Sequence, residues 1–242
     1  MRCCMIKDII RRLRVLLVHI LSHNKPFFSC PSSVLIVAPH PDDEVLGCGG
    51  LIVRLVAEGK IPHIVFMTGG EQSHGCCCNI SKEEIIAARH SLASNAMRIL
   101  GVPESNIHYL SYPDGNIDRN NEETRRLSDL THDLIPESVF VPHWGEGWSD
   151  HVKTGSIVKE LLPEKVPVYE YCVWLWYYNV WGLDWKNARR LKMTAEEHLL
   201  KLRAINQYVT PLAPCGKPWS GVLPRILLKA NQSKTELYFK VR

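Results

Sequence analysis

The sequence lacks several features that would place it in a broad class. It has no run of about 18 or more apolar residues, the length that a membrane-spanning helix requires. The formal net charge is only +4, and no basic stripe with interleaved aromatic residues occurs, so we expect no nucleic-acid partner. No internal repeat or low-complexity linker divides the 242 residues, a length that suits one domain.

Paired cysteine spacing is also missing. The nine cysteines are an odd number, and Cys76, Cys77 and Cys78 are consecutive, which suits neither a disulfide framework nor a C-x-x-C zinc site. Cysteines used in this way indicate a reducing environment, so we expect a cytoplasmic protein. We interpret the triplet as part of a loop in a reduced protein.

Residues 1–30 form a basic amphipathic segment that precedes a single predicted α/β domain at residues 31–242. Within it, residues 5–21 mix Ile, Leu and Val with one lysine and three arginines. The apolar part is broken by His19, and no small-residue cleavage site follows, which argues against a secretory signal. Two interpretations stay open: a helix docked on the domain, or a basic helix in weak peripheral contact with an anionic membrane surface.

From residue 34 to about residue 173, short apolar runs alternate with helical segments. Strands are expected at residues 34–38, 61–68, 107–110, 138–141 and 166–173. Helices are expected at residues 51–58, which the glycine-rich residues 47–50 lead into, and at 81–100, 121–134 and 151–162. This alternation predicts a parallel sheet with helices on both faces. A functional site should then lie at the carboxyl ends of the strands.

The segment HPDDE at residues 40–44 follows the first expected strand directly. Imidazole and carboxylate groups are zinc ligands, and a catalytic zinc usually has three protein ligands and a water. Two prolines flank His40 and lower the entropic cost of assembling a site there. A further ligand must come from another loop, and Asp150-His151 is the best donor. Zinc lowers the pKa of bound water to about 7 while a nearby carboxylate takes the proton, so this set predicts amide hydrolysis.

These patterns also have structural interpretations. An Asp-Asp-Glu sequence after proline is often only a solvated turn or the first turn of a helix, where acidic side chains suit the dipole. The glycines at residues 47–50 could suggest dinucleotide binding. They lack the G-x-G-x-x-G spacing, and no acidic residue ends the second expected strand, so we reject this alternative.

Residues 38–44, followed by the glycines at 47–50, resemble the signature of the LmbE-like, PIG-L-type N-acetylglucosaminyl deacetylases. Further similar pieces follow in the expected order: residues 67–71, 88–89, 100–102, 112–115 and 149–151. The resemblance covers about residues 33–162. It implies a Rossmann-like fold and an enzyme that removes the acetyl group from an N-acetylated sugar, of the N-acetylglucosamine type, and releases acetate and a free amine.

The resemblance also implies roles for individual residues. His40, Asp43 and His151 would bind one zinc ion, with Fe²⁺ as the alternative metal, and Asp42 would be the general base. Arg89 and Asp114 match positions that border the substrate or support the site. Their structural interpretations are a charge on a helix surface and an Asp-Gly turn.

One position departs from the family pattern. The last motif usually reads His-x-Asp-His, and its first histidine assists the oxyanion or the leaving amine; here the residue is Trp148. An indole N–H can donate one hydrogen bond but cannot shuttle a proton, so we place Trp148 among the substrate-binding residues. His143 could supply the missing catalytic group or be an ordinary loop histidine. Glu146 stands where the family often has an acid and could support a ligand.

Aromatic residues are concentrated between residues 174 and 185. Such rings stack on apolar sugar faces, but clustered aromatics are first a packing resource, so core or lid packing is the first interpretation. If Trp148 marks lost catalysis, the chain would instead be a catalytically weakened sugar- or glycolipid-binding protein of the same fold.

Overall fold

The computed structural model describes residues 2–26, 31–75, 79–178 and 181–242. The predicted loop at Cys76, Cys77 and Cys78 therefore lies outside the described residues. The strands are β1 (Val34–Ala38), β2 (His63–Phe66), β3 (Ile107–Tyr109), β4 (Ser138–Pro142), β5 (Val168–Tyr171), β6 (Ala188–Lys192) and β7 (Thr235–Lys240). The α-helices are α1 (Arg2–Ser22), α2 (Asp43–Ala57), α3 (Lys82–Leu100), α4 (Glu122–Leu134), α5 (Ser149–Leu161), α6 (Ala195–Val209) and α7 (Arg225–Asn231).

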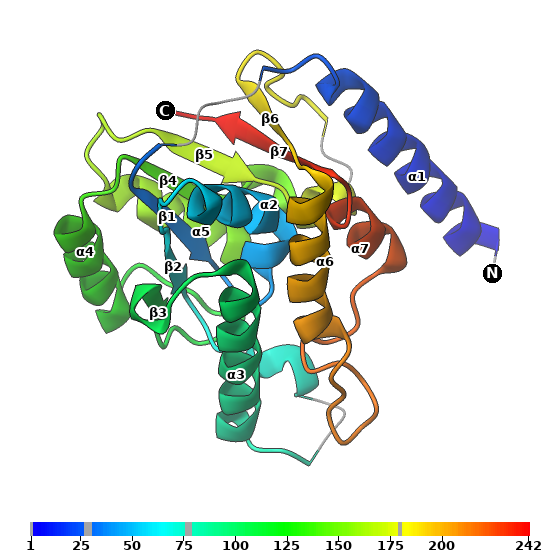
Figure 1. Ribbon diagram of the computed structural model, residues 1–242. Coiled ribbons are helices and arrows are strands. Elements are labelled where there is room, and N and C mark those ends of the chain that lie inside the picture. Colours follow the sequence, from blue (N-terminus) through cyan, green and yellow to red (C-terminus); the bar gives the residue numbers. More distant parts are fainter. Residues whose placement is uncertain (1, 27–30, 76–78, 179–180) are drawn as a thin grey trace.

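Within the described ranges, these strands form one mixed sheet of seven strands in the order β3-β2-β1-β4-β5-β7-β6 (Figure 1). The first five strands of this order are parallel to one another, and β7 runs antiparallel to both β5 and β6. The predicted mostly parallel α/β sheet is confirmed. The chain builds β1, β2 and β3 outward and then returns to β4 on the other side of β1. The strand order reverses between β1 and β4, and ligands bind at the carboxyl ends of strands at such a point.

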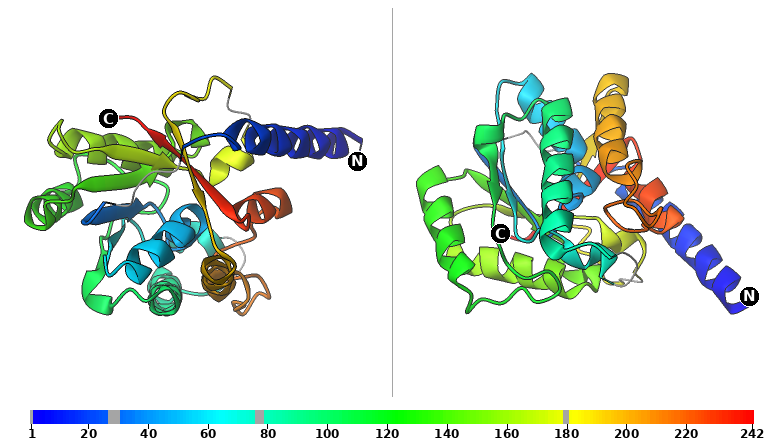
Figure 2. Two further views of the ribbon diagram at one scale, coloured as in Figure 1. Left: turned by 45° about the horizontal axis from the view of Figure 1, so that its top comes forward. Right: turned by 90° about the horizontal axis from the view of Figure 1, so that it is seen from below.

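Helices cover both faces of the sheet (Figure 2). Alternate residues of β1 point to opposite faces, as the period of a strand requires. Ile36 packs in one core with residues of α2, α3 and α6. Leu35 and Val37 pack in a second core with residues of α4 and α5. Because both faces are covered, the central strands are apolar throughout, which explains why the sequence predicted them.

Helix α2 begins eight residues before the predicted start at residue 51, so the glycines at 47–50 lie inside the helix and not before it. These glycines permit close packing. A Cβ atom on Gly47 would overlap the ring of Tyr171, and one on Gly50 would overlap the side chain of Met193. The first residue of helix α2 is thus Asp43, itself one of the predicted site residues.

Strands β6 and β7 and helices α6 and α7 were not predicted. Strand β6 has the sequence ARRLK, and only Ala188 and Leu191 are buried, so it lacks the apolar run that marks the central strands. Antiparallel edge strands with one solvated face commonly show this weaker pattern. Strands β7 and β6 follow β5 in the sheet and extend it toward α1 and α7 (Figure 1).

Candidate metal and catalytic site

The loop between β1 and α2 carries the first site residues. Backbone N–H groups of Met67 and Thr68 donate to the carbonyls of Ala38 and Pro39, so the chain after β2 supports this loop. Asp42, the last residue before α2, has a φ of 137°, in a region that favours glycine. Backbone strain of this kind persists where the surrounding structure imposes it, and it is concentrated at functional sites.

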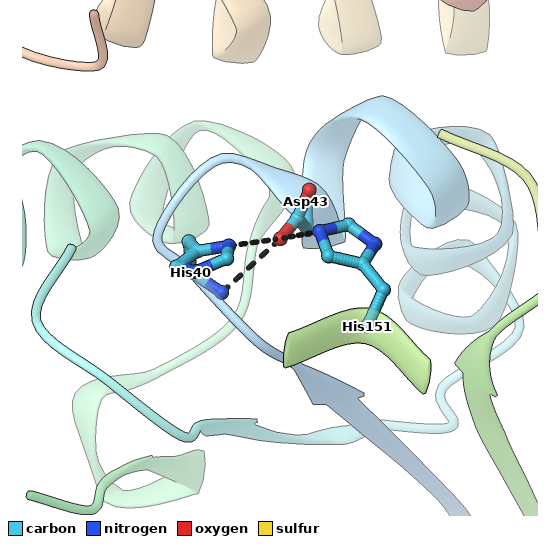
Figure 3. A group of neighbouring side chains, drawn as sticks. All are labelled: His40, Asp43 and His151. Carbon is cyan, nitrogen blue, oxygen red and sulfur yellow. Dashed lines mark hydrogen bonds and ion pairs between the residues drawn. The ribbon is translucent and has the colours of Figure 1, made fainter. Parts of the chain in front are cut away.

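Three predicted ligands meet beside this loop (Figure 3). Oδ2 of Asp43 lies 3.2 Å from Nδ1 of His40 and 3.3 Å from Nε2 of His151. His151 comes from the first turn of α5, more than 100 residues later in the chain, and is fully buried. The three side chains offer ligand atoms that all lie within 4.8 Å of one another.

A carboxylate lies on the far side of each histidine ring. Nε2 of His40 is 3.1 Å from Oδ1 of Asp114 and 3.3 Å from Oδ2 of Asp150. Nδ1 of His151 is 2.7 Å from Oε2 of Glu146. Metal-binding histidines usually donate their other ring N–H to such a partner, which fixes the tautomer and the orientation of the ring. The arrangement leaves Nδ1 of His40 and Nε2 of His151 directed at Asp43.

The donor set fits a divalent metal. Nε2 of His151 is buried and has no hydrogen-bond partner among the described residues, although it faces the Asp43 carboxylate. Two imidazoles and one carboxylate are a common ligand set for zinc and for ferrous iron. A second group, His40, Asp114 and Asp150, also offers three ligand atoms in a small volume, but it shares His40 with the first. The structure therefore suggests a metal site and leaves the identity of the ion open.

The electrostatic field of the site favours a cation. Burial lowers the pKa of His151, but Asp43 and Glu146 outweigh this effect and raise it to about 9. Burial raises the pKa of Asp43, whereas His151 and His40 hold it well below the ordinary carboxyl range. Acidic groups that stabilise a proton on an imidazole also attract a metal ion in its place, so protons and metal compete here.

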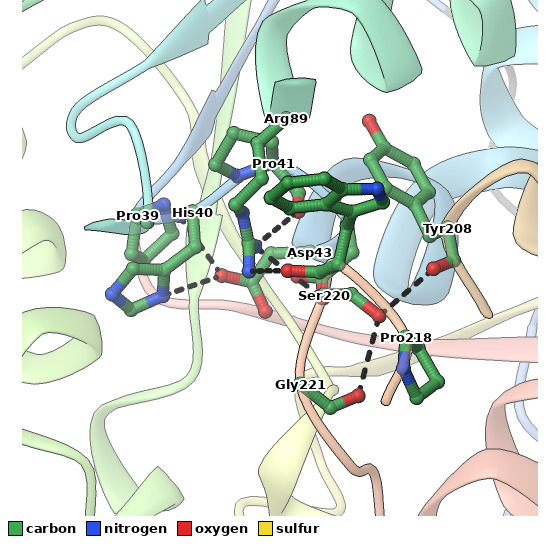
Figure 4. A network of polar contacts seen from close by, with 12 residues as sticks. Pro39, His40, Pro41, Asp43, Arg89, Tyr208, Pro218, Ser220 and Gly221 are labelled. Carbon is green, nitrogen blue, oxygen red and sulfur yellow. Dashed lines mark hydrogen bonds and ion pairs between the residues drawn. The ribbon is translucent and has the colours of Figure 1, made fainter. Parts of the chain in front are cut away.

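Arg89 of helix α3 contacts Pro41 (Figure 4) and lies close to Asp42. Nη2 of Arg89 donates to the carbonyl oxygen of Pro41 at 2.6 Å and lies 3.7 Å from Oδ2 of Asp42. Nη1 of Arg89 donates to the carbonyl of Trp219 at 3.3 Å. Burial raises the pKa of Asp42 to about 7, an effect that Arg89 opposes and Asp43 reinforces. A carboxylate with a pKa near neutrality suits a general base.

A pocket of about 260 Å³ opens over these groups. Its predicted lining residues are His40, Asp42, Asp43, Arg89, Asp114 and Trp148. The other lining residues were not named as site residues from the sequence: Leu46, Gly70, Gln72, Ser73, Trp174, Ser220, Gly221, Val222 and Leu223. Most of them belong to loops far along the chain, where no local pattern relates them to the HPDDE segment.

Asp114 is placed by the turn that contains it. Its backbone N–H donates to Oε1 of Glu71 at 2.9 Å, and its Oδ2 accepts from the N–H of Gln72 at 2.8 Å. The other oxygen, Oδ1, faces His40. The carboxylate therefore both lines the pocket and contacts His40, one of the predicted ligands, whereas a simple exposed Asp-Gly turn would do neither.

Trp148 lies at the rim of the pocket. It stacks on Trp174 with ring centroids 5.3 Å apart and planes inclined by 10°. Its side chain remains exposed to solvent, while Trp174 is partly buried. The aromatic segment after β5 thus contributes one ring to the pocket wall and packs the rest of η4 (Trp174–Trp176) against the body.

His143 lies elsewhere. It is 2% exposed and packs edge-on against Phe239, and its Nδ1 accepts the N–H of Gly145 at 3.0 Å. It does not line the pocket, and none of its contacts with the described residues reaches His40, Asp43 or His151. The structure therefore does not place His143 in the pocket that is lined by Asp42, the other predicted catalytic residue.

Comparison with known proteins finds deacetylases among the relatives of this chain. An uncharacterized deacetylase, YaiS, of Escherichia coli (strain K12) is 30% identical over 126 residues, which are 49% of this chain and 62% of that protein. A diacetylchitobiose deacetylase of Thermococcus kodakarensis is 29% identical over 139 residues, which are 55% of this chain and 50% of that protein. The chain thus spans less than two thirds of the length of either relative.

A solved structure of N,N'-diacetylchitobiose deacetylase from Pyrococcus horikoshii superposes with a TM-score of 0.59 and 24% identity, covering 81% of this chain and 77% of that one. At this identity the similarity concerns the fold. A model of the PIG-L family, described as GlcNAc-PI de-N-acetylase, matches residues 35–162, more than half of the 242 residues. These residues run from β1 through α5 and include all the predicted metal ligands. The chain therefore belongs to the GlcNAc-PI de-N-acetylase family.

Proposed function

We propose that this protein hydrolyses the N-acetyl group of an N-acetylhexosamine in a glycan or glycoconjugate precursor and releases acetate and a free amine. One observation carries the proposal: the ligand atoms of His40, Asp43 and His151 converge, and His40 and Asp43 line the same pocket as Asp42. The pocket volume of about 260 Å³ suits a small molecule or a terminal sugar residue.

His40, Asp43 and His151 would hold the metal, which we propose is zinc, with Fe²⁺ as the alternative. When bound, the ion polarises the amide carbonyl and lowers the pKa of a water molecule. Asp114 and Glu146 keep the two imidazoles oriented through their outer nitrogen atoms. The ligands are thus positioned before any substrate enters.

Asp42 would take the proton from the attacking water at a carboxylate oxygen. The water oxygen adds to the acetyl carbon, the C–N bond breaks, and the proton that Asp42 holds passes to the departing nitrogen. Arg89, fixed by two backbone carbonyls, limits the positions that the Asp42 carboxylate can adopt. Asp42 therefore acts first as base and then as acid, which fits a site in which Trp148 cannot transfer protons.

Trp148 and Trp174 would contact the apolar face of the sugar ring. Their parallel rings form the aromatic part of the pocket rim. Stacking of this kind orients a sugar without contributing to proton transfer.

Acetate release over a panel of N-acetylhexosamine compounds, with metal analysis of the same sample, tests the proposal. We expect acetate and amine in equal amounts and activity that is lost with a chelator and restored by metal. Asp42→Asn should reduce turnover by about 10²- to 10⁴-fold and keep the metal, because only the base is removed. Asp129→Asn, an exposed position on α4, is the matched control. Normal turnover by Asp42→Asn would exclude this mechanism.

A second function is favoured by Trp148, which replaces the family's proton-transferring histidine. In this alternative the same pocket binds an N-acetylated sugar or glycolipid headgroup with weakened or no hydrolysis. Saturable binding of a panel compound to metal-loaded protein, with no acetate formed, would support this function in place of the first.

A further inference from the structure

Helix α1 turns its apolar side away from the protein. Its large aliphatic side chains from residue 6 onward are 43–61% exposed: Ile6, Ile9, Ile10, Leu13, Leu16, Leu17, Ile20 and Leu21. Their spacing of one, three and four residues puts them on one continuous stripe of the helix. Figure 2 shows the helix at the edge of the molecule, with much of its length projecting from the body.

The opposite side of α1 docks on the body, largely through polar residues. Arg14 and Val18 are each 4% exposed, and Nη1 of Arg14 donates to the carbonyl of Leu175 at 2.5 Å. Nε of Arg11 donates to the carbonyl of Tyr177 at 3.2 Å, and its guanidinium lies 3.8 Å from the centre of the Tyr177 ring. These contacts fix the rotation of the helix about its axis. The apolar stripe is therefore held outward.

An exposed stripe of this kind is unusual for a protein surface that faces only water. Single exposed aliphatic residues are common, but a contiguous patch marks a surface that contacts a partner or a membrane. No helix in the described part of the chain combines the length and hydropathy needed to span a bilayer. The stripe is thus suited to lying on a surface.

Positive charge surrounds the stripe. At 100° per residue, the exposed Lys7 and Arg12 lie on its two opposite flanks. A groove of about 850 Å³ between α1 and α7 adjoins it, and its charged lining residues, Arg12, Arg225 and Lys229, are all basic. The only acidic residue of α1, Asp8, pairs with Arg11 at 3.2 Å. The flanks of the stripe are therefore complementary to an anionic surface.

We propose that α1 docks on an anionic lipid surface. The aliphatic stripe would enter the boundary between headgroups and acyl chains, and Lys7, Arg12, Arg225 and Lys229 would contact lipid phosphates. A second copy of the chain is a poorer occupant, because pairing two such stripes brings basic flanks together. The docked helix and the pocket share one segment: η4 receives the Arg14 hydrogen bond at Leu175 and supplies Trp174 to the pocket wall.

Vesicle flotation of the full chain tests this proposal. We expect binding to vesicles of phosphatidylcholine with phosphatidylglycerol, much weaker binding to phosphatidylcholine alone, and a decrease with salt. The double variant Leu13→Glu/Ile20→Glu should lose at least about tenfold in partition coefficient, because both side chains would enter the apolar boundary. Leu199→Glu is the matched control, because Leu199 is 50% exposed but lies on helix α6. This variant should bind the vesicles like the unaltered chain.

The charge contribution is tested separately. Lys7→Gln and Arg12→Gln should each reduce binding to the anionic vesicles by about fivefold and weaken its salt dependence. Circular dichroism checks that each variant is folded. Failure of the unaltered chain to bind anionic vesicles, or equal binding by Leu13→Glu/Ile20→Glu, would overturn the proposal. Concentration-dependent dimerisation that requires Leu13, without vesicle binding, would assign the stripe to a second copy and overturn it as well.

Discussion

Nδ1 of His151 lies 2.7 Å from Oε2 of Glu146, and both side chains are fully buried. The other carboxylate oxygen, Oε1, accepts the backbone N–H groups of Val173 at 2.5 Å and Leu175 at 3.2 Å. Glu146 is thus fixed by the chain after β5, and it fixes His151 in turn. Because Nδ1–H donates to Glu146, Nε2 is the nitrogen directed at Asp43, and it is the one that must lose its proton before a metal ion binds there.

Glu146→Gln should therefore weaken metal binding without unfolding the protein. The amide keeps one oxygen for the backbone donors but removes the charge that favours the Nδ1–H tautomer, so we expect metal affinity to fall about 10- to 100-fold. A competition titration against a zinc-binding dye measures this change. Glu160→Gln, at an exposed position on α5, is the control. An unchanged dissociation constant for Glu146→Gln would show that the outer carboxylate does not support the ligand.

His143 should affect stability more than activity. Burial, together with Lys159 and Arg14, lowers the pKa of His143 to about 3, whereas an unfolded histidine titrates near 6.5. Between these values the unfolded chain binds a proton that the folded chain does not. Stability should consequently fall as pH decreases through this window, by up to about 1.4 kcal/mol per pH unit from this residue.

His143→Asn removes this titration, because an amide remains neutral. The difference in Tm between the variant and the unaltered chain should shrink from pH 7 to pH 4. Acetate release by the variant at pH 7 should stay within about threefold of that of the unaltered chain, because His143 does not line the pocket. Thermal unfolding across this pH range and the acetate assay make the two measurements. A large loss of turnover in folded His143→Asn would return His143 to the catalytic group.

Trp148→Ala should raise KM more than it lowers kcat. Trp148 stacks on Trp174 at the pocket rim and carries no group that can transfer a proton. Loss of one aromatic stacking contact corresponds to roughly 0.5–1.5 kcal/mol, or about two- to tenfold in KM. Trp148→Phe keeps a ring and should restore most of the affinity. A fall in kcat of several hundredfold with unchanged KM would instead give Trp148 a role in the chemical step.

Gly47→Ala should destabilise the protein although alanine is the better helix former. In an open helix this change stabilises by about 1 kcal/mol. Inside α2 the added methyl group would overlap the Tyr171 ring, so we expect a net loss of about 1–3 kcal/mol in the free energy of unfolding. Urea denaturation measures it, with Ser156→Ala on the exposed side of α5 as the control. A stabilised Gly47→Ala would mean that the helix and strand β5 are not in close contact.

The parts of the fold that the sequence predicted are those with a strong local pattern. The parallel strands are apolar runs such as VLIVA at 34–38, because both faces of the sheet are covered. The start of α2 was misplaced because its glycines serve contacts with Tyr171 and Met193, which no local pattern encodes. Strand β6 was missed because its charged residues lie at a half-exposed edge.

The same distinction applies to the site. The predicted metal ligands could be named from the HPDDE segment, the Asp-His pair and the family resemblance, and the structure brings these three side chains together. The supporting contacts could not be predicted from the sequence, because they join distant parts of the chain. Arg89 donates to the carbonyl of Trp219, and Ser220 and Gly221 line the pocket. His143 is the opposite case. The sequence suggested it as a catalytic group, but after β4 its side chain packs against Phe239 of β7 and does not line the pocket.

The position of a bound metal ion tests the central claim most directly. A crystal structure of the zinc-loaded protein, with anomalous diffraction recorded on both sides of the zinc absorption edge, would locate the ion. We expect one zinc ion bound by Nδ1 of His40, Nε2 of His151 and a carboxylate oxygen of Asp43, with Asp42 close by and unbound. A zinc ion held by His40, Asp114 and Asp150, or no ion at either group at saturating zinc, would contradict the account.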